Sequence, residues 1–134
     1  MDIHRAGSRP SRKAPPEWFT GTVWIDPIID SRPPARVNAL RVSFEPGART
    51  AWHTHPLGQT LHVLSGSGLV GRRNEPPQII RAGDTVWFEP GEEHWHGASP
   101  DTGMVHLAIQ EAVDGSAADW LEQVADGDYR PPAA

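Results

Sequence analysis

In the stretch of residues 47–66, two of the three histidines, His53 and His55, are separated by a single threonine. Side chains alternate between the two faces of a β-strand, so a strand here places both imidazoles on one face. Residues 56–58, Pro-Leu-Gly, predict a bend before the next strand. Such a bend can return Gln59 to the side that the histidines face. Two imidazoles and an amide oxygen on one face predict a metal site that is open on one side.

A second stretch, residues 83–96, also combines a predicted strand, a turn and a pair of histidines separated by one residue. A Gly-Asp pair leads into an apolar strand, and Pro90-Gly91 predicts a turn before the next strand. His94 and His96 then alternate with Trp95, so both of these imidazoles share a face. The chain therefore presents two histidine pairs on two predicted strands.

The overall composition restricts the class of protein. The chain has 134 residues, enough for one domain with one core. Its net charge is −5 and Lys13 is its single lysine, which argues against nucleic acid or an anionic membrane as the main partner. No cysteine, signal peptide or long apolar run is present in the sequence. We therefore expect a cytoplasmic protein whose main partner is neither nucleic acid nor a membrane.

Glycine and proline punctuate short apolar runs, and this pattern is typical of an all-β protein. Residues 1–16 are basic, proline-rich and aperiodic, so we expect a flexible arm followed by a single domain at 17–134. Residues 18–25 predict one strand, or two strands broken at Gly21, and Asp26-Pro27 is expected to end it. A tight turn is expected at residues 66–68.

The predicted strand at residues 37–44 has a clear apolar face. Leu40, Val42 and Phe44 alternate with more polar residues, so they are expected inside. Residues 104–110 form the last clear strand, but its two faces leave two possibilities open. The apolar face of Val105, Leu107 and Ile109 can form the core, or the opposite face with His106 and Gln110 can line a polar cavity.

Residues from Ser116 onward predict a short C-terminal helix. Ser116 and Asp119 resemble a capping box, and Trp120, Leu121 and Val124 form an apolar stripe. Outward-facing apolar side chains are numerous for a small barrel, which predicts a homo-oligomer, either a dimer or a tetramer. These residues are Trp52, Trp95, Val105, Leu107 and Ile109.

The two histidine stretches also resemble a known pair of motifs. Residues 47–66, with glycine, His-x-His, an amide and glycine at matching intervals, are similar to the first cupin motif. Residues 83–94 are similar to the second, except that Glu89 replaces its usual first proline. This resemblance implies a single cupin barrel, a jelly-roll-like double-stranded β-helix. It also implies one divalent metal ion per chain, with ligands at His53, His55, Gln59 and His94.

A closer resemblance is to the small bacterial manganese-dependent cupin hydroxynitrile lyases, the (R)-mandelonitrile lyase type. The segments that carry it are residues 18–23, 44–61, 90–92, 94–98 and 106–111. The resemblance implies reversible cleavage of a cyanohydrin such as (R)-mandelonitrile to an aldehyde and hydrogen cyanide. It further implies that His96 and His106 line the pocket as catalytic residues, and that one or the other moves the proton and holds the departing cyanide. Leu40, Val42 and Gln110 would form the substrate pocket. The departures from the family lie in the N-terminal arm and around residues 72–77, away from the expected site.

The ligand set also bears on the chemistry. Most related cupin sites carry a glutamate where this chain has Gln59, and a neutral amide leaves a divalent ion with its full charge. This favours Lewis-acid chemistry over oxygen activation. Nitrogen and oxygen donors suit Mn²⁺, the metal of the resembled family, but also Fe, Ni or Zn. Two alternatives stay open: a cupin dioxygenase or decarboxylase acting on a small enol or carboxylate, and a non-catalytic metal-dependent binder.

Overall fold

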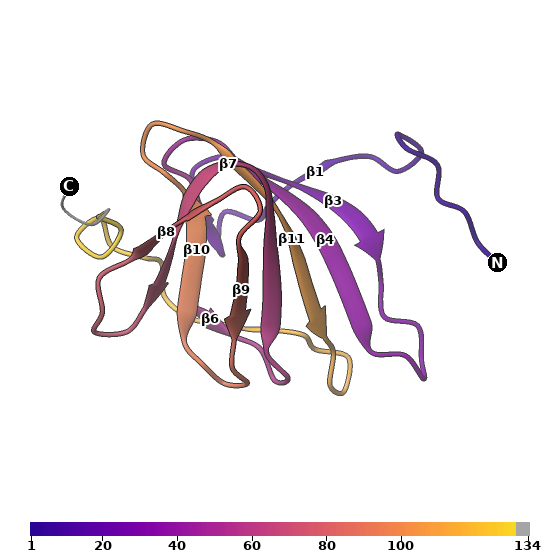
Figure 1. Ribbon diagram of the computed structural model, residues 1–134. Helices are drawn as coiled ribbons and strands as arrows, with labels where there is room; N and C mark the ends of the chain where they lie inside the picture. The colour runs from indigo at the N-terminus through magenta and orange to yellow at the C-terminus, as the bar shows by residue number, and fades with distance from the viewer. Residues whose placement is uncertain (131–134) are drawn as a thin grey trace.

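The computed structural model describes residues 1–130, and these fold into an antiparallel β-structure with no helix among them. The strands curl around a common interior (Figure 1). Their bounds are β1 Arg12–Lys13, β2 Phe19–Thr20, β3 Val23–Ile29, β4 Val37–Phe44, β5 Arg49–Thr50, β6 His53–Thr54, β7 Gln59–Arg72, β8 Gln78–Arg81, β9 Thr85–Phe88, β10 His94–Ala98, β11 Met104–Glu111 and β12 Asp119–Trp120.

The strand order is β1-β3-β4-β11-β7-β10-β5-β2, with β8 and β9 paired to β7, and β6 paired to β10 and β12. The long strand β7 belongs to both halves of this arrangement. Its first half pairs with β11 and β9, and its second half pairs with β10 and β8. Two facing sheets are thus joined through one continuous strand, as expected for a jelly-roll-like barrel.

The turn expected at residues 66–68 is wrong, because β7 continues through it. Gly66 has φ +78, and a Cβ there would collide with the Gly103 carbonyl. Near this point the pairing with β11 shifts its register between Val105 and His106. The glycine therefore provides a bend that carries β7 from one sheet to the other, instead of a chain reversal.

Residues 18–25 form two strands instead of one, because β2 and β3 are separated at Gly21. The expected end at Asp26-Pro27 is wrong, because β3 continues to Ile29. Among the described residues, β3 has no strand partner other than β4 beyond Ile25, so Pro27 lies at an open edge. A proline without an N–H group is tolerated at such an edge.

The expected C-terminal helix is also wrong. Asp119–Trp120 form strand β12, and Trp120 pairs with His53 of β6. The pairing extends beyond the strand, because the Leu121 amide donates to the Trp52 carbonyl. The Trp120 ring stacks on Trp18 with a centroid distance of 5.2 Å. These tertiary contacts outweigh the weak helical preference of a short segment.

Two groups of buried apolar residues occupy different positions. The main core lies between the sheets and consists of Phe19, Val23, Val42, Phe44, Ala48, Leu61, Val63, Ile80, Phe88, Ala98, Met104 and Ala108, with Leu40 packed against it. The second group, here called the tryptophan cluster, consists of Trp52, Leu69, Trp95, Val124 and Tyr129. The inward placement expected for Leu40, Val42 and Phe44 is confirmed.

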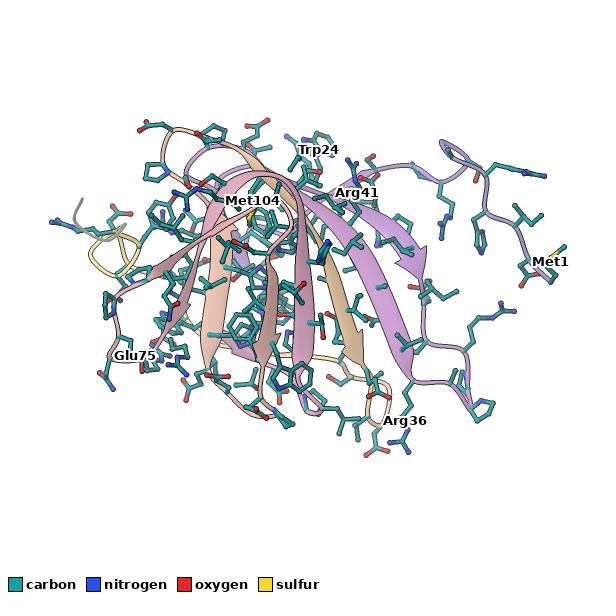
Figure 2. The ribbon with its side chains drawn as sticks, in the orientation of Figure 1. Met1, Trp24, Arg36, Arg41, Glu75 and Met104 are labelled. Carbon is teal, nitrogen blue, oxygen red and sulfur yellow. The ribbon has the colours of Figure 1, made fainter. Side chains whose placement is uncertain are left out.

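The open question about β11 has a clear answer. Met104, His106, Ala108 and Gln110 are all buried, whereas Val105, Leu107 and Ile109 are only half-buried. The polar-containing face therefore lines the interior. Figure 2 shows side chains concentrated between the sheets around Met104, while Arg36 and Glu75 lie on peripheral loops.

The beginning of the chain is only partly separate from the sheets. Within residues 1–16, expected as a flexible arm, β1 pairs with Trp24 and Ile25 of β3. The Ala14 amide also donates to the Val23 carbonyl at 2.9 Å. The first residues extend away from the sheets (Figure 1), but Arg9 donates to the Ile28 carbonyl and Ser11 donates to Asp26, both on β3. The domain boundary at residue 16 stays a prediction. No helix in the described part of the chain has the length and apolar character to cross a membrane.

Candidate metal centre

The four predicted ligands come together from three neighbouring elements. His53 of β6 lies directly opposite His94 of β10. His55 follows β6, and Gln59 begins β7 after a turn in which Gly58 has φ +83. A Cβ at Gly58 would collide with the Trp87 side chain and the Phe88 carbonyl. The sharp glycine bend expected from the sequence thus returns Gln59 to the histidines, and all four side chains are buried.

Three of the histidines are held in the same way. The Nδ1 atom of each faces a backbone carbonyl oxygen, which can only accept, so Nδ1 carries the proton and Nε2 keeps its lone pair. The distances are 2.9 Å from His53 to Ala51 O, 2.6 Å from His55 to Ala117 O and 2.8 Å from His94 to Glu92 O. This outer-shell arrangement is typical of metal-binding imidazoles.

The donor atoms are close enough for a single ion. Donor atoms of His53, His94 and His96 lie within 4.8 Å of one another. The His55 ring lies 4.9 Å from His53 and 5.4 Å from His94 between centroids. The Nε2 atom of His55 is buried without a hydrogen-bond partner in the described residues. A nitrogen-rich donor set with an orphaned Nε2 fits a divalent transition metal. Two histidines are candidates for the third imidazole ligand beside His53 and His94. His96 is a candidate because its donor atom is close to theirs, and His55 because a backbone carbonyl orients its ring. The predicted ligand set therefore stays a prediction.

A chain of three amides fixes the orientation of Gln59. Its Nε2 donates to Gln110 Oε1 at 2.9 Å, and the Gln110 amide in turn donates to Asn38 Oδ1. With its nitrogen occupied in this way, Gln59 turns Oε1 toward the histidines, 3.1 Å from His94 Nε2. The oxygen, which is the ligand atom of an amide, therefore faces the centre.

Burial keeps the histidines neutral. Desolvation, followed by repulsion from neighbouring imidazoles, lowers the pKa of His53 and of His96 well below the ordinary value. Desolvation also lowers the pKa of His55, and lowers the pKa of His94 to about 3. Metal ligands must be unprotonated, so the centre is prepared to bind an ion at neutral pH.

His96 and His106 form a contacting pair beside this centre. His106 Nε2 lies 3.0 Å from His96 Nδ1, and both residues are fully or almost fully buried. Burial lowers the pKa of His106 to about 4. His96 Nε2 has no hydrogen-bond partner among the described residues, and His96 lines the cavity described below. His106 does not line it, so the structure places His106 behind His96.

A cavity of about 340 Å³ opens onto His53, His55 and Gln59. The predicted pocket residues Leu40, Val42 and Gln110 line it. The sequence did not indicate several other lining residues, because they come from separate strands and have no shared local pattern. These are Trp18, Phe19, Ile25, Asn38, Thr50, Ala108 and Trp120. The N-terminal arm was expected to lie away from the site, and this is wrong because Arg12, Lys13 and Pro15 also line the cavity.

Comparison with known proteins agrees with this geometry. A protein-family model described as a cupin domain matches residues 40–109, which include all the predicted metal ligands. The chain belongs to the cupin family. It is 58% identical over 130 residues to a protein of Granulicella tundricola named (R)-mandelonitrile lyase, covering 97% of this chain and 99% of that relative. The family resemblance drawn from the motifs is thereby confirmed.

Solved structures of cupins have the same fold. A cupin-like protein from Thermotoga maritima superposes with a TM-score of 0.83 at 40% identity, covering 97% of this chain and 96% of that one. A predicted oxalate decarboxylase from the same organism gives 0.71 at 19% identity, covering 84% and 100%. The second similarity supports the fold alone.

Proposed function

We propose that this cupin is a divalent-metal-dependent hydroxynitrile lyase. It cleaves an aromatic cyanohydrin such as (R)-mandelonitrile reversibly into an aldehyde and hydrogen cyanide. The observation that carries the proposal is the position of an unpartnered imidazole nitrogen, His96 Nε2, beside a neutral donor set in a largely apolar cavity. The similarity to a relative named (R)-mandelonitrile lyase supports the same reaction class.

The proposed ligands are His53, His55, Gln59 and His94, and the proposed ion is Mn²⁺, with Fe, Ni or Zn also compatible with these donors. When bound, the ion supplies Lewis acidity that favours the negatively charged form of the cyanohydrin oxygen. Gln59 is neutral and leaves this charge uncompensated. This property favours Lewis-acid lyase chemistry over oxygen activation by a dioxygenase.

His96 serves as the base. Its lowered pKa keeps it neutral, so Nε2 can take the proton of the cyanohydrin hydroxyl. The electrons of that O–H bond form the carbonyl, and the bond between carbon and cyanide breaks with its electron pair leaving on cyanide. The proton then passes from His96 to cyanide, which leaves as hydrogen cyanide. His106, in contact with His96 Nδ1, fixes the orientation of the imidazole and is the second residue on which catalysis depends.

The rest of the cavity holds the aromatic part of the substrate. Leu40 and Val42 supply an apolar wall, and the stacked Trp18 and Trp120 rings lie at another side. Apolar and aromatic lining removes a phenyl ring from water and stabilises the complex. Gln110 lies in the amide chain that orients Gln59, so it contributes to both pocket and metal centre.

We also propose that the protein works as a cytoplasmic homo-oligomer, a dimer or a tetramer. Trp52 and Trp95 no longer support this, because the chain's own C-terminal segment covers them. The half-buried outer residues of β11, Val105, Leu107 and Ile109, remain the basis of the proposal. Light scattering tests it, and a mass near 14.7 kDa at micromolar concentration would contradict it.

Cyanide release from (R)- and (S)-mandelonitrile tests the proposed reaction. The protein is purified, its metal content is measured, and activity is compared before and after chelation and after reloading with Mn²⁺. We expect activity that disappears on chelation and returns with the ion. An Mn²⁺-loaded protein that is inactive on every aromatic cyanohydrin would contradict the proposal and favour the dioxygenase or decarboxylase alternative.

A further inference from the structure

One row of side chains crosses four strands of the sheet that forms the cavity wall. Arg12 of β1 lies opposite Ile25 of β3, Ile25 lies opposite Val42 of β4, and Val42 lies opposite His106 of β11. Residues directly opposite each other in antiparallel strands project to the same face. Arg12 therefore stands on the cavity side, at the open edge of the sheet, and Arg12, Ile25 and Val42 all line the cavity.

Lys13 is next in sequence but occupies the other face. It lies opposite Trp24, and its ammonium group lies 5.6 Å from the centre of the Trp24 ring. Trp24 is exposed and does not line the cavity. Both cations of β1 line the cavity, but Arg12 is the one that lies in the same row as Ile25 and Val42.

The charged side chains that line the cavity are both cations. Its lining contains Arg12 and Lys13 but no aspartate or glutamate among the described residues. Neither cation lies within 4.0 Å of a carboxylate in the described part of the chain. The histidines and Gln59 are neutral and do not offset this charge. A cavity whose walls carry one sign of charge concentrates ligands of the opposite sign.

We propose that the cavity selects an aromatic ligand with a carboxylate at the end remote from the histidines, and that Arg12 binds this carboxylate. The proposal rests on the proposed lyase function, and it names the substrate class as ring-carboxylated cyanohydrins and their aldehydes. Three strand spacings of ~4.8 Å separate the Arg12 backbone from His106 by about 14 Å. The Arg12 side chain extends over part of that distance, and an aromatic ring packed against Ile25 and Val42 extends over the rest.

A guanidinium suits this task because its planar fork binds a carboxylate through two parallel hydrogen bonds. Charge-assisted hydrogen bonds that are partly open to water favour binding by about 10-fold. We therefore expect the protein to prefer a carboxylated ring over an unsubstituted one by about 10-fold. The preference should weaken as salt screens the guanidinium.

The test compares 4-formylbenzoate with benzaldehyde by calorimetry on the Mn²⁺-loaded protein, which measures binding without any cleavage. The wild type is compared with Arg12→Gln, and Arg41→Gln serves as the matched control. Arg41 is an exposed arginine on β4 that lies opposite Asp26 and Leu107 and does not line the cavity. We expect Arg12→Gln to abolish the preference for the carboxylate and Arg41→Gln to retain it.

An unchanged preference in Arg12→Gln would overturn the proposal, and would indicate that the carboxylate binds at the metal centre instead. Equal losses in Arg12→Gln and Arg41→Gln would also overturn it, since general charge would then explain the effect. The ratio of kcat/KM for 4-carboxymandelonitrile and mandelonitrile should follow the binding preference. If neither cyanohydrin releases cyanide while the Arg12-dependent preference is present, the lyase function fails and the anion site stands.

Discussion

Residues 52–55 and strand β10 each place histidines on one face and a tryptophan on the other. On the inner face, His53, His94 and His96 gather within a few ångströms of one another. On the outer face, Trp52 and Trp95 lie in the tryptophan cluster under the C-terminal segment. The same two stretches of backbone thus support two buried regions of opposite chemistry.

The two regions contribute differently to stability. A buried tryptophan removes roughly 150–250 Å² from water, which at ~25 cal/mol per Å² stabilises the fold by about 4–6 kcal/mol as an upper estimate. Burying an imidazole requires that it stay neutral and that its nitrogens find partners. The Nε2 atoms of His55 and His96 have none in the described chain. The outer face therefore stabilises the fold, while the inner face loses stability because its donor atoms stay available for an ion.

The largest effect is expected from His96→Ala on the inner face. Removing the proposed base should lower turnover of mandelonitrile by roughly 10²–10⁴-fold while metal content is retained. Cyanide release and elemental analysis on the same sample measure both quantities. His62→Ala is the matched control, because His62 lies on the outer side of β7 against Thr85. Loss of metal in His96→Ala would show that His96 is a ligand.

Trp52→Ala tests the outer face next to His53. The substitution leaves a cavity in the tryptophan cluster and removes the ring that lies 3.8 Å from the Arg73 guanidinium. We expect a loss of about 3–5 kcal/mol in the free energy of unfolding, measured in denaturant. Metal content per folded molecule should stay unchanged. A destabilised variant that also releases its metal would show that the two faces are not independent.

Acid titration of the metal-free protein measures how the buried histidines of the inner face make stability depend on pH. Burial lowers the pKa of His94 to about 3 and of His106 to about 4, whereas unfolded histidines titrate near ~6.5. Between these values the unfolded state binds more protons, so stability falls with decreasing pH by up to ~1.4 kcal/mol per pH unit for each such histidine. Unfolding free energies measured from pH 7 to 4 should show this loss. His106→Leu should reduce the slope of unfolding free energy against pH. An unchanged slope would show that His106 does not contribute to the loss.

The smallest effect is expected from Tyr129→Phe in the tryptophan cluster. The Tyr129 hydroxyl donates to the Ala98 carbonyl, and its ring packs beside Trp95 at 5.6 Å between centroids. Removing the hydroxyl should lower the unfolding free energy by about 1 kcal/mol, because the ring contacts remain. Denaturant unfolding measures the loss. A change in metal affinity in this variant would weaken the separation of the two faces.

Local sequence predicted the clustering of the histidines and Gln59 better than the surroundings of that cluster. The His53 and His55 spacing, the Gly58 bend and the alternation of His94 with Trp95 are short-range features, and the structure has each of them. The cavity depends on contacts between distant segments. Arg12 reaches it through pairing of β1 with β3, and Trp120 reaches it through pairing of β12 with β6. No local pattern specifies such pairings.

The wrong expectations have the same origin. Residues after Ser116 have a weak helical pattern, but pairing with β6 and stacking of Trp120 on Trp18 decide their conformation. Trp52 and Trp95 were expected to face outward and to support a homo-oligomer, but they are covered by Val124 and Tyr129 of their own chain. A sequence pattern identifies an apolar outer face but does not identify what covers it.

Neighbouring substitutions on opposite faces of β10 test whether the inner face binds the metal while the outer face stabilises the fold. His94→Ala should retain the fold and lose most of its metal, because one anchored imidazole donor is removed from the centre. Trp95→Ala, its matched control, should lose stability and keep its metal in the folded fraction. The measurement is the metal content of folded His94→Ala by elemental analysis. We expect a content near zero, whereas full occupancy would show that the metal binds elsewhere.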